Sequence, residues 1–501
     1  MAKSSNLRRR KICPVLLAMG LMTPATMRAE YAITSAAKSV TIENGSTIQV
    51  EAGELQVPES RRRPTARRIT LPYYRLKSES PKPASPIFLL AGGPGSSWLD
   101  QFESDENHRE VAFYRTIADV VLFDQRGGGH SRPAMICPQT AELPADQPLD
   151  LSALRASMRT ALAACRDHWQ EEGVDLAAYN SIENAADVND LRLALGYGKV
   201  SLVGGSYGSH LALEILRRYP EAVDRVVLFG VEGPDHTWDD PAAMLSTLGR
   251  IAAKAEESPA LSGLVPAGGL LKALERVLAR LESAPQTVTV AEGTESRRVV
   301  VDANVVRRMA RTGAGRRKAP NAWPEMILAM DRGDFSFAAR RKLENLTVGL
   351  ADPMHYSMDC SSGISERRRS RYRTDPAVST LGDINFEYEA LCDLWPSEDL
   401  GEAFRANVVS NTPTLIVHGT WDLSTPIENA REVVASLANG QLVEVIGGNH
   451  GALYNLFKRW PPIFDLLRKF LSGSSVDFPA QVIDLPEATP VAPPIPQTLN
   501  H

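Results

Sequence analysis

The residues with the clearest chemistry surround Ser206, which stands in the run G-G-S-Y-G at positions 204–208, after a short apolar segment. A serine with glycines two positions before and after it can occupy a strained turn between a strand and a helix, which lifts the hydroxyl above the sheet edge. Glycine suits both flanking positions because a Cβ there would crowd the turn. The helix that follows directs its first N–H groups toward the same point and favours negative charge there. The pattern predicts a nucleophile that attacks a carbonyl carbon.

A serine hydroxyl needs a base and a carboxylate that orients the base. Asp422 and His450 each lie in a loop that follows an apolar run near the C-terminus, His450 within G-G-N-H-G at 447–451. Their order after the serine, acid then histidine, is the order that serines on such turns have. We predict that His450 is the base and Asp422 its orienting acid. His418 is the rival base, but it directly continues an apolar strand, which favours a structural role. The weaker alternatives for the acid are Asp393 and Asp359.

The oxyanion that forms during attack needs hydrogen-bond donors. One is expected to be the backbone N–H of Tyr207, the residue after the nucleophile. The second is expected in the loop A-G-G-P-G-S-S at 91–97, which follows another apolar run. Gly93 is the first candidate there and Gly92 the second, because glycine lets the backbone approach a ligand closely. A simple tight turn is the alternative interpretation of this loop.

Length and composition indicate one large core with an accessory domain, since the chain has 501 residues of which 43% are hydrophobic. The net charge of −5 is small for this length, so we expect no nucleic-acid partner. Three basic runs, within 61–68, 307–318 and 367–373, are interpreted as solvated faces. No metal or cofactor is expected, because no Cys-x-x-Cys or paired Cys/His spacing occurs.

The N-terminus has the layout of a secretory signal. Four basic residues at 8–11 precede an apolar stretch from 12 to about 22, and small residues follow up to 29. The apolar stretch is shorter than the ~20 residues that a membrane span needs. We therefore predict a signal peptide at 1–29 and a periplasmic or secreted protein without a membrane span. The alternative is a basic tail with a buried helix.

The cysteine count agrees with export. There are five cysteines, and removal of Cys13 with the signal leaves an even number, which fits two disulfides in an oxidising compartment. Of the three possible connectivities, Cys137–Cys165 and Cys360–Cys392 close the shortest loops. Each such loop would stabilise the fold by roughly 3.5 kcal/mol in the chain-entropy model.

Apolar runs alternate with helical stretches through most of the chain. β-rich segments between 40 and 77 predict antiparallel strands that open a sheet. Further strands are expected at 87–90, 120–123, 200–203, 226–229, 414–417 and 442–446. This alternation predicts an α/β protein whose mostly parallel sheet is flanked by helices. The candidate catalytic residues all follow strand ends, where open α/β sheets bind their ligands.

The interval between Ser206 and Asp422 is much longer than a minimal sheet of this kind needs. We expect a mainly helical cap at 235–405, inserted over the active site between two parts of the core at 30–234 and 406–473. The tail at 474–501 is rich in proline and is expected to be extended or disordered.

Taken together, the motifs resemble those of the serine aminopeptidases of the α/β-hydrolase fold, the group of the proline iminopeptidases and the secreted tripeptidyl aminopeptidases. The resemblance rests on G-G-P-G at 92–95, D-Q-R-G at 124–127, the turn around Ser206 and the loops of Asp422 and His450. It implies an α/β-hydrolase fold with a large cap between nucleophile and acid. Two positions depart from the family: Ala91 stands where a histidine is usual, and D-Q-R-G continues as G-G-H-S at 128–131. Arg126 is expected to be buried against carbonyls or a carboxylate.

The expected activity is that of an exported serine exopeptidase, which removes N-terminal residues (a single proline-type residue or a di- or tripeptide) from short peptides through an acyl-enzyme. Such an enzyme must bind the substrate's ammonium group with a carboxylate. Glu232, just after the strand expected at 226–229, is the first candidate and Asp359 the second. The alternative is a secreted carboxylesterase or lipase-like hydrolase with the same triad. A binding protein without catalysis conflicts with the presence of all three triad residues.

Overall fold

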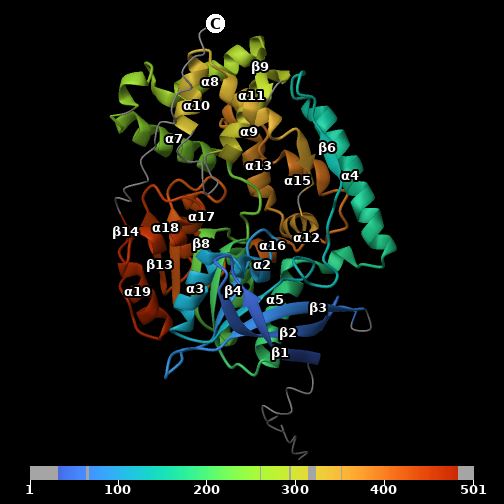
Figure 1. The fold of residues 1–501 in the computed structure, drawn as a ribbon, viewed down its shortest axis with the longest axis vertical. Helices are drawn as coiled ribbons and strands as arrows, with labels where there is room; N and C mark the ends of the chain where they lie inside the picture. The colour runs from blue at the N-terminus through green and yellow to red at the C-terminus, as the bar shows by residue number, and fades with distance from the viewer. Residues whose placement is uncertain are drawn as a thin grey trace, which may run out of the picture.

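The computed structural model describes residues 32–63, 67–259, 261–292, 295–313, 323–350 and 352–482. Figure 1 shows a lower part built on a sheet and an upper part made mostly of helices. The predicted signal peptide at 1–29 lies outside the described residues, and so does the chain after 482.

A ten-stranded sheet forms the centre of the lower part, in the order β1-β2-β3-β5-β4-β7-β8-β12-β13-β14. The first three strands pair antiparallel, and β3 also pairs antiparallel with β5. From β5 to β14 every pairing is parallel. The bounds are β1 Ala32–Thr41, β2 Thr47–Pro58, β3 Arg68–Leu76, β4 Ile87–Leu90, β5 Val120–Phe123, β7 Val200–Ser206, β8 Val223–Val231, β12 Thr414–Gly419, β13 Gly440–Val445 and β14 Gln481–Val482. The predicted α/β fold with a mostly parallel sheet is confirmed.

Helices cover both faces of the sheet, which is why the central parallel strands β4 and β5 are apolar and buried along their whole length. In β4, Phe88 and Leu90 belong to one hydrophobic core, and Ile87 and Leu89 belong to the other, as the period of two in a strand requires. The first core contains the helices α5 Ser181–Ala194 and α6 Tyr207–Arg218. The second contains α2 Trp98–Phe102, α3 Asp105–Arg115, α18 Ala452–Arg459 and α19 Pro462–Leu471.

The two ends of the sheet differ from the sequence-based expectation. Strand β1 covers 32–41, so it begins before the β-rich segment that was predicted from about 40. At the other end, β14 pairs in parallel with β13, although the tail from 474 was expected to be extended or disordered. The tail is extended where it forms β14, and it packs more deeply than along the surface, because Val476, Phe478 and Val482 are buried in the second core.

Between β8 and β12 the chain forms the helices and the hairpin of the upper part, above the C-terminal edge of the sheet (Figure 1). The hairpin β9–β10 is an addition to the mainly helical pattern that the sequence predicts. The elements are α7 Pro241–Glu257, α8 Gly269–Ser283, β9 Gln286–Glu292, β10 Glu295–Val301, α9 Ala303–Gly313, α10 Trp323–Asp331, α11 Ser336–Leu343, β11 Thr347–Gly349, α12 Pro353–Ser362, α13 Glu366–Thr374, α14 Val378–Leu381, α15 Phe386–Leu391 and α16 Glu402–Arg405. After β12 follows α17 Ile427–Val434.

One segment that the sequence assigns to the core packs instead on this upper part. Strand β6, Thr140–Glu142, pairs antiparallel with β11, and the helix α4, Leu151–Glu171, runs beside α15 (Figure 1). The Lys342 Nζ donates to the backbone carbonyl of Gln147 at 2.6 Å. The segment between β5 and α5 therefore packs on the upper part, although the chain before and after it belongs to the lower part. The reason is that the apolar side of α4 needs cover, which the upper helices supply.

Two disulfides tie these segments together, with the pairing that the sequence predicts. Cys137 and Cys165 have their Cα atoms 5.5 Å apart and fix α4 to the chain after β5. Cys360 and Cys392 have theirs 5.3 Å apart and fix α12 to the end of α15.

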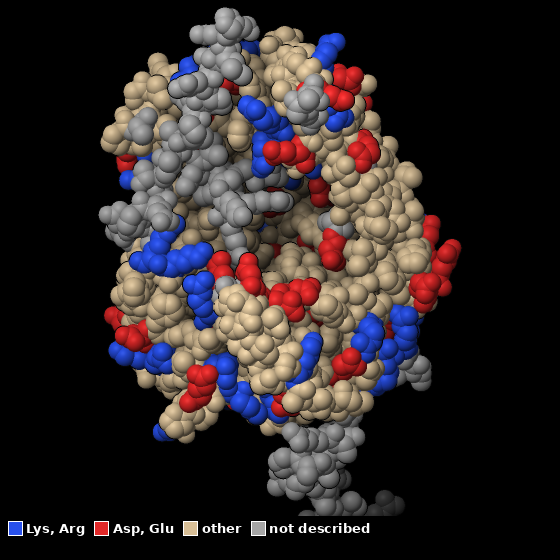
Figure 2. Space-filling view, viewed as in Figure 1, with Lys and Arg blue, Asp and Glu red and all other residues tan. Residues whose placement is uncertain are grey.

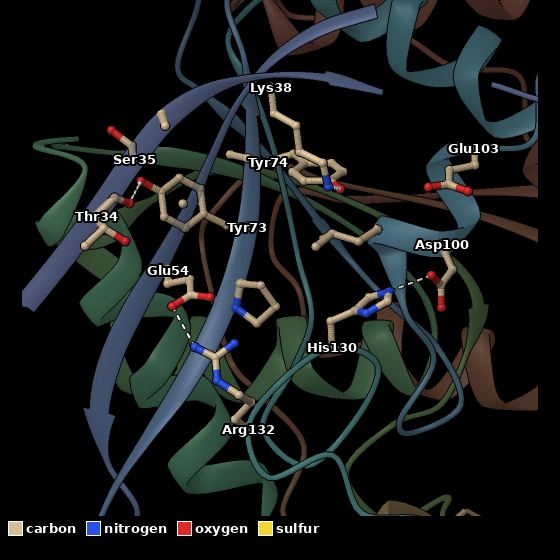
Figure 3. Close-up of a pocket in the computed structure, with 15 residues that line it drawn as sticks. Thr34, Ser35, Lys38, Glu54, Tyr73, Tyr74, Asp100, Glu103, His130 and Arg132 are labelled. Carbon is tan, nitrogen blue, oxygen red and sulfur yellow. Dashed lines mark hydrogen bonds and ion pairs between the residues drawn. The ribbon is translucent and has the colours of Figure 1, made fainter. Parts of the chain in front are cut away.

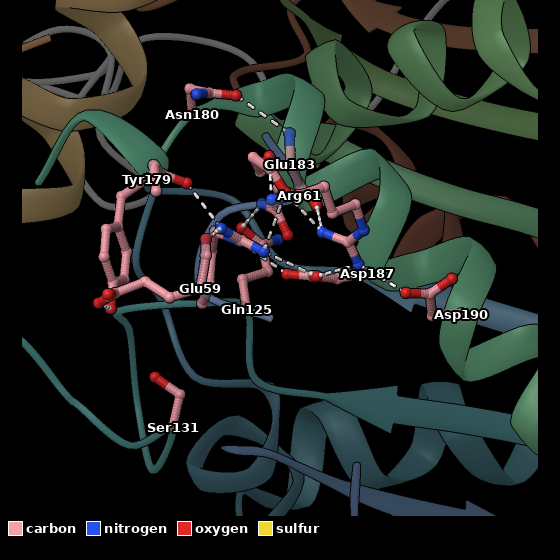
Figure 4. A network of polar contacts seen from close by, with 12 residues as sticks. Glu59, Arg61, Gln125, Ser131, Tyr179, Asn180, Glu183, Asp187 and Asp190 are labelled. Carbon is pink, nitrogen blue, oxygen red and sulfur yellow. Dashed lines mark hydrogen bonds and ion pairs between the residues drawn. The ribbon is translucent and has the colours of Figure 1, made fainter. Parts of the chain in front are cut away.

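A buried network of charges holds the D-Q-R-G loop to α5 (Figure 4). Arg126 is fully buried and donates to both carboxylate oxygens of Asp187 at 2.7 and 2.8 Å. It also donates to the carbonyls of Glu59 and Ala178. The predicted burial of Arg126 against carbonyls and a carboxylate is confirmed.

The basic runs are not uniformly solvated faces, as the sequence-based interpretation had them. Arg61 forms ion pairs of 2.6–2.7 Å with three carboxylates of α5, those of Glu183, Asp187 and Asp190. Arg368 is buried and pairs with Asp235 and Glu432. A guanidinium can leave water where several carboxylates compensate its charge, and those partners lie far away in the sequence.

Candidate active site

Ser206 ends β7 and immediately precedes α6, with φ 55° and ψ −132°. Among the described residues it is the single non-glycine residue with a positive φ. A Cβ on Gly204 would lie 2.3 Å from the carbonyl oxygen of Gly208, and a Cβ on Gly208 would lie 2.3 Å from that of Leu90. Both glycines of the motif are therefore required by close backbone packing. A residue in such a conformation costs about 1–3 kcal/mol and is typical of functional sites.

Asp422 and His450 lie in contact at the C-terminal edge of the sheet, with His450 Nδ1 2.9 Å from Asp422 Oδ2. The carboxylate is buried and also accepts from the N–H groups of Ser424 and Thr425 and from the Thr425 hydroxyl. Burial alone would raise the pKa of Asp422, but His450, His418 and the Thr425 hydroxyl together lower it. The ionised carboxylate can therefore accept the Nδ1–H of His450, which is the tautomer in which Nε2 carries the lone pair.

His418 is fully buried and uses both ring nitrogens within the fold. Its Nδ1 accepts from the Val231 N–H at 3.0 Å, and its Nε2 lies 2.6 Å from the Thr425 carbonyl oxygen. Burial lowers the pKa of His418. These contacts support the structural interpretation, in which His418 links β8 to the loop that carries Asp422. Asp393, one of the two alternatives for the orienting acid, pairs with Arg159 at the surface.

Ser206 and His450 line one cavity of about 200 Å³, together with Gly92 and Gly93. A Cβ on Gly92 would lie 3.3 Å from the Ser206 Cβ, and Gly93 has a φ of +109°. The loop of the two glycines therefore passes directly beside the serine, as an oxyanion loop must. The remaining lining residues are Leu90, Ala91, Ser96, Trp98, Gln101, Gly205, Phe229, Gly451 and Tyr454.

The D-Q-R-G loop at 124–127 holds this glycine loop in place through hydrogen bonds. The Gln125 side-chain amide donates to the Ala91 carbonyl at 2.9 Å. The buried Asp124 accepts from the Ser97 hydroxyl and from the Leu99 N–H, at the start of α2. The bracing of Ala91, where the family has histidine, therefore runs through its backbone.

A second cavity, of about 470 Å³, lies over β1–β3 and the outer side of α2 (Figure 3). His130, from the unusual G-G-H-S segment, has its Nε2 2.6 Å from Asp100 Oδ1 in this cavity. Arg132 pairs with Glu54, and Lys38 donates to the Tyr74 hydroxyl. The described residues that line it include neither Ser206 nor His450. His130, which belongs to the segment that departs from the family motif, thus lies in a cavity that Ser206 does not line.

Glu232 lies beside the nucleophile turn. Its N–H donates to Ser209 Oγ at 2.9 Å, and Ser209 Oγ donates to the Ser206 carbonyl at 2.6 Å. Glu232 Oε1 and Asp359 Oδ1 are both buried without a hydrogen-bond partner among the described residues. Burial, together with the negative charges of Asp359 and Asp239, raises the pKa of Glu232 well above its usual value. The structure therefore brings the two predicted amine ligands into one acidic cluster.

Aromatic rings enclose this cluster. The Tyr388 hydroxyl donates to Asp359 Oδ2 at 3.3 Å, and its ring stacks on Trp238 and on His355 at centroid distances of 5.4 and 5.3 Å. His355 Nδ1 lies 2.8 Å from Asp359 Oδ2. Burial alone would lower the pKa of His355, but Asp359 and further carboxylates raise it to about 8. Figure 2 shows a hollow between the lower and upper parts of the molecule, with acidic side chains on its rim.

Sequence reasoning missed several members of this cluster, namely Asp239, His355, Tyr388 and Trp238. None of them stands in a motif that predicts chemistry. The one signal was the closeness of Trp238 and Asp239 to Glu232 along the chain. The others come from α12 and the helix before Cys392, so only the folded chain brings them together.

Comparisons with known proteins concern the fold and the family of the chain. Residues 85–259 match the family model described as alpha/beta hydrolase fold, and residues 380–459 match that of TAP-like protein. The chain has the α/β-hydrolase fold. A solved structure of this fold, the proline iminopeptidase of Mycobacterium smegmatis, covers 87% of this chain and 97% of its own at 14% identity and a TM-score of 0.39.

Three curated relatives refine the family. The Escherichia coli protein YuaR is 22% identical over 76% of this chain and 77% of its own length. The tripeptidyl aminopeptidase of Streptomyces lividans is 28% identical over 38% of this chain and 37% of its own. The proline iminopeptidase of Xylella fastidiosa strain 9a5c is 30% identical over 29% of this chain and 32% of its own. The matched part spans about a third of each peptidase. The predicted resemblance to α/β-hydrolase aminopeptidases is confirmed, and the relatives suggest a peptidase of this type.

The described ranges between 32 and 482 contain no helix that is both long and apolar enough to cross a bilayer. This finding and the two disulfides are compatible with an exported protein.

Proposed function

We propose that this protein is an exported serine aminopeptidase that acts on the free N-terminus of short peptides. Ser206 Oγ attacks the carbonyl carbon of the scissile bond while His450 Nε2 takes the hydroxyl proton. Asp422 holds the imidazole and stabilises its charged form. The N–H groups of Tyr207 and Gly93 stabilise the oxyanion.

The second half of the reaction uses the same residues. His450 returns the proton to the leaving nitrogen as the C–N bond breaks, which leaves an acyl-enzyme on Ser206. A water that His450 deprotonates then attacks the ester carbon, and Ser206 recovers its proton. No residue outside this set is needed for the bond changes.

The observation that carries the choice of a free-amine substrate is the acidic cluster beside the nucleophile. Buried carboxylate oxygens without partners are costly unless a ligand compensates them. Ser209 joins Glu232 to the Ser206 backbone, and Asp359 belongs to the same cluster. A substrate ammonium group would supply the positive charge and the donors that both oxygens lack. An esterase with the same triad has no use for such a cluster.

The test compares two substrates that differ only at the N-terminus, a peptide amide with a free amine and its N-acetylated form. We expect the wild type to cleave the free peptide at least 100-fold faster in kcat/KM, because acetylation removes the charge that the cluster binds. Ser206→Ala should cleave neither. Equal rates for both peptides, or cleavage of simple esters with no cleavage of the free peptide, would replace the proposal with the esterase alternative.

A further inference from the structure

We infer that the cavity of about 200 Å³ between α2 and α18 is the subsite for the leaving group, and that it accepts an apolar or aromatic residue on the C-terminal side of the scissile bond. The inference rests on the proposed function for its substrate class. It adds which part of the substrate this cavity takes and what chemistry it selects.

The position of the cavity relative to Ser206 assigns the two halves of the substrate. Glu232 lies on the α6 side of the serine, where His210 of that helix has its Nδ1 3.7 Å from Glu232 Oε1. The cavity lies on the opposite face, since it is lined by Trp98 of α2 and by Tyr454 of α18, and these helices belong to the second core. A peptide whose ammonium group binds the acidic cluster therefore extends its departing half toward the cavity.

The position of His450 agrees with this direction of the peptide. The base must return its proton to the leaving nitrogen, so it has to lie on the leaving-group side of the scissile carbon. His450 lines the cavity, together with Gly451, which follows it. The leaving amine is thus protonated at the mouth of the cavity that receives it.

The walls define the class of residue that fits. The rings of Phe229 and Tyr454 meet edge to face at a centroid distance of 5.3 Å, and Trp98 also lines the cavity. Aromatic walls favour an apolar or aromatic guest in edge or offset contact. A cavity of about 150 Å³ holds one benzene ring in a well-studied case, so this cavity has room for one ring or branched side chain and not for a long peptide.

One polar group in the wall lacks a partner. Trp98 is 4% exposed, and its indole N–H is buried without an acceptor in the part of the chain that the structure describes. Indole N–H groups in buried positions normally have an acceptor. A carbonyl of the departing residue would supply one, so Trp98 can fix the orientation of the leaving group.

The experiment uses dipeptide amides with one favoured N-terminal residue and either Phe or Gly in the second position. Wild type should prefer the Phe substrate in kcat/KM. Gln101→Phe, which fills the cavity from α2, should lower the Phe-to-Gly ratio at least tenfold. Glu103→Phe places the same ring just after the end of α2, in the wall of the other cavity, and should leave the ratio unchanged. Trp98→Phe should cost about threefold to tenfold on a substrate whose leaving residue has a carbonyl, compared with one that lacks it.

The outcomes separate this inference from the proposed function. The subsite assignment is overturned if Gln101→Phe leaves the Phe-to-Gly ratio unchanged. It is also overturned if Gln101→Phe instead changes the preference for the N-terminal residue when the leaving residue is held constant. The latter result would mean that the cavity holds the acyl side. If N-acetylated and free peptides are cleaved equally by wild type, the aminopeptidase proposal fails, while the effect of Gln101→Phe on the leaving-group ratio still decides the subsite.

Discussion

Replacement of Glu232 by glutamine tests the amine site most sharply, because the side chain keeps its size but cannot become a carboxylate when a substrate ammonium group binds beside it. Glu232 Oε1 and Asp359 Oδ1 are buried and have no hydrogen-bond partner in the part of the chain that the structure describes, so an ammonium group that binds them forms charge-assisted hydrogen bonds in a site shielded from water. Such a bond contributes about 1.5–3 kcal/mol. At about 1.4 kcal/mol per factor of ten, Glu232→Gln should lower kcat/KM on free-amine peptides by roughly 10- to 100-fold.

The assay measures kcat/KM of wild type and variant on a free-amine peptide amide and on a small neutral ester. The ester rate should barely change, because Ser206, His450 and the oxyanion N–H groups are untouched. Glu325→Gln is the matched control, since Glu325 in α10 also has buried carboxylate oxygens without a hydrogen-bond partner among the described residues. It should leave both rates as they are.

Two results would refute the reasoning. If the peptide and the ester fall equally, Glu232 is a structural residue that holds the turn. If neither falls, the ammonium group binds elsewhere, and Asp359→Asn becomes the next variant. The double variant should lose less than the product of the two single effects, because both carboxylates serve one ligand.

Three further predictions concern the base, the cluster and the disulfides. His450→Ala should lower kcat by several orders of magnitude, whereas His418→Ala should destabilise the fold and keep measurable turnover; the reverse result would exchange their roles. The raised pKa of His355, about 8 against 6.5, corresponds to about 2 kcal/mol of stability that is complete below pH 6.5 and is lost as the pH rises through 8. Urea unfolding should therefore show that His355→Gln costs about that much at pH 6 and little at pH 9.5, and an equal cost at both values would contradict it. Serine at both Cys360 and Cys392 should raise KM for free-amine peptides more than serine at both Cys137 and Cys165. The reason is that only the Cys360–Cys392 disulfide fixes α12, the helix that contains Asp359.

The central parallel strands could be predicted from the sequence because both of their faces are buried. The strands expected at 87–90 and 120–123 have those bounds in the structure. The end of the sheet could not be predicted, since Val476 and Phe478 are isolated apolar residues in a stretch without periodicity. They become buried because the edge of β13 is open to them.

The candidate catalytic residues could be predicted because each follows a strand whose C-terminal end lies at the same edge of the sheet. Ser206 is the last residue of β7, and the loops of Asp422 and His450 follow β12 and β13. The aromatic and acidic partners of Glu232 come from the long insertion, where no local pattern fixes which helix lies over the serine. His355 and Tyr388 reach the cluster through packing and through the disulfide that joins α12 to the end of α15. Sequence spacing contains no information on such contacts.

Trapping of the acyl-enzyme tests the central claim most directly. The protein is mixed with a free-amine peptide ester, quenched in acid within milliseconds and digested, and the mass of the fragment that contains Ser206 is measured. The account predicts that the unblocked acyl group is attached to Ser206 and that the N-acetylated ester gives much less of this adduct. An adduct on another residue, or equal labelling of Ser206 by both esters, would contradict an aminopeptidase that uses Ser206 as its nucleophile.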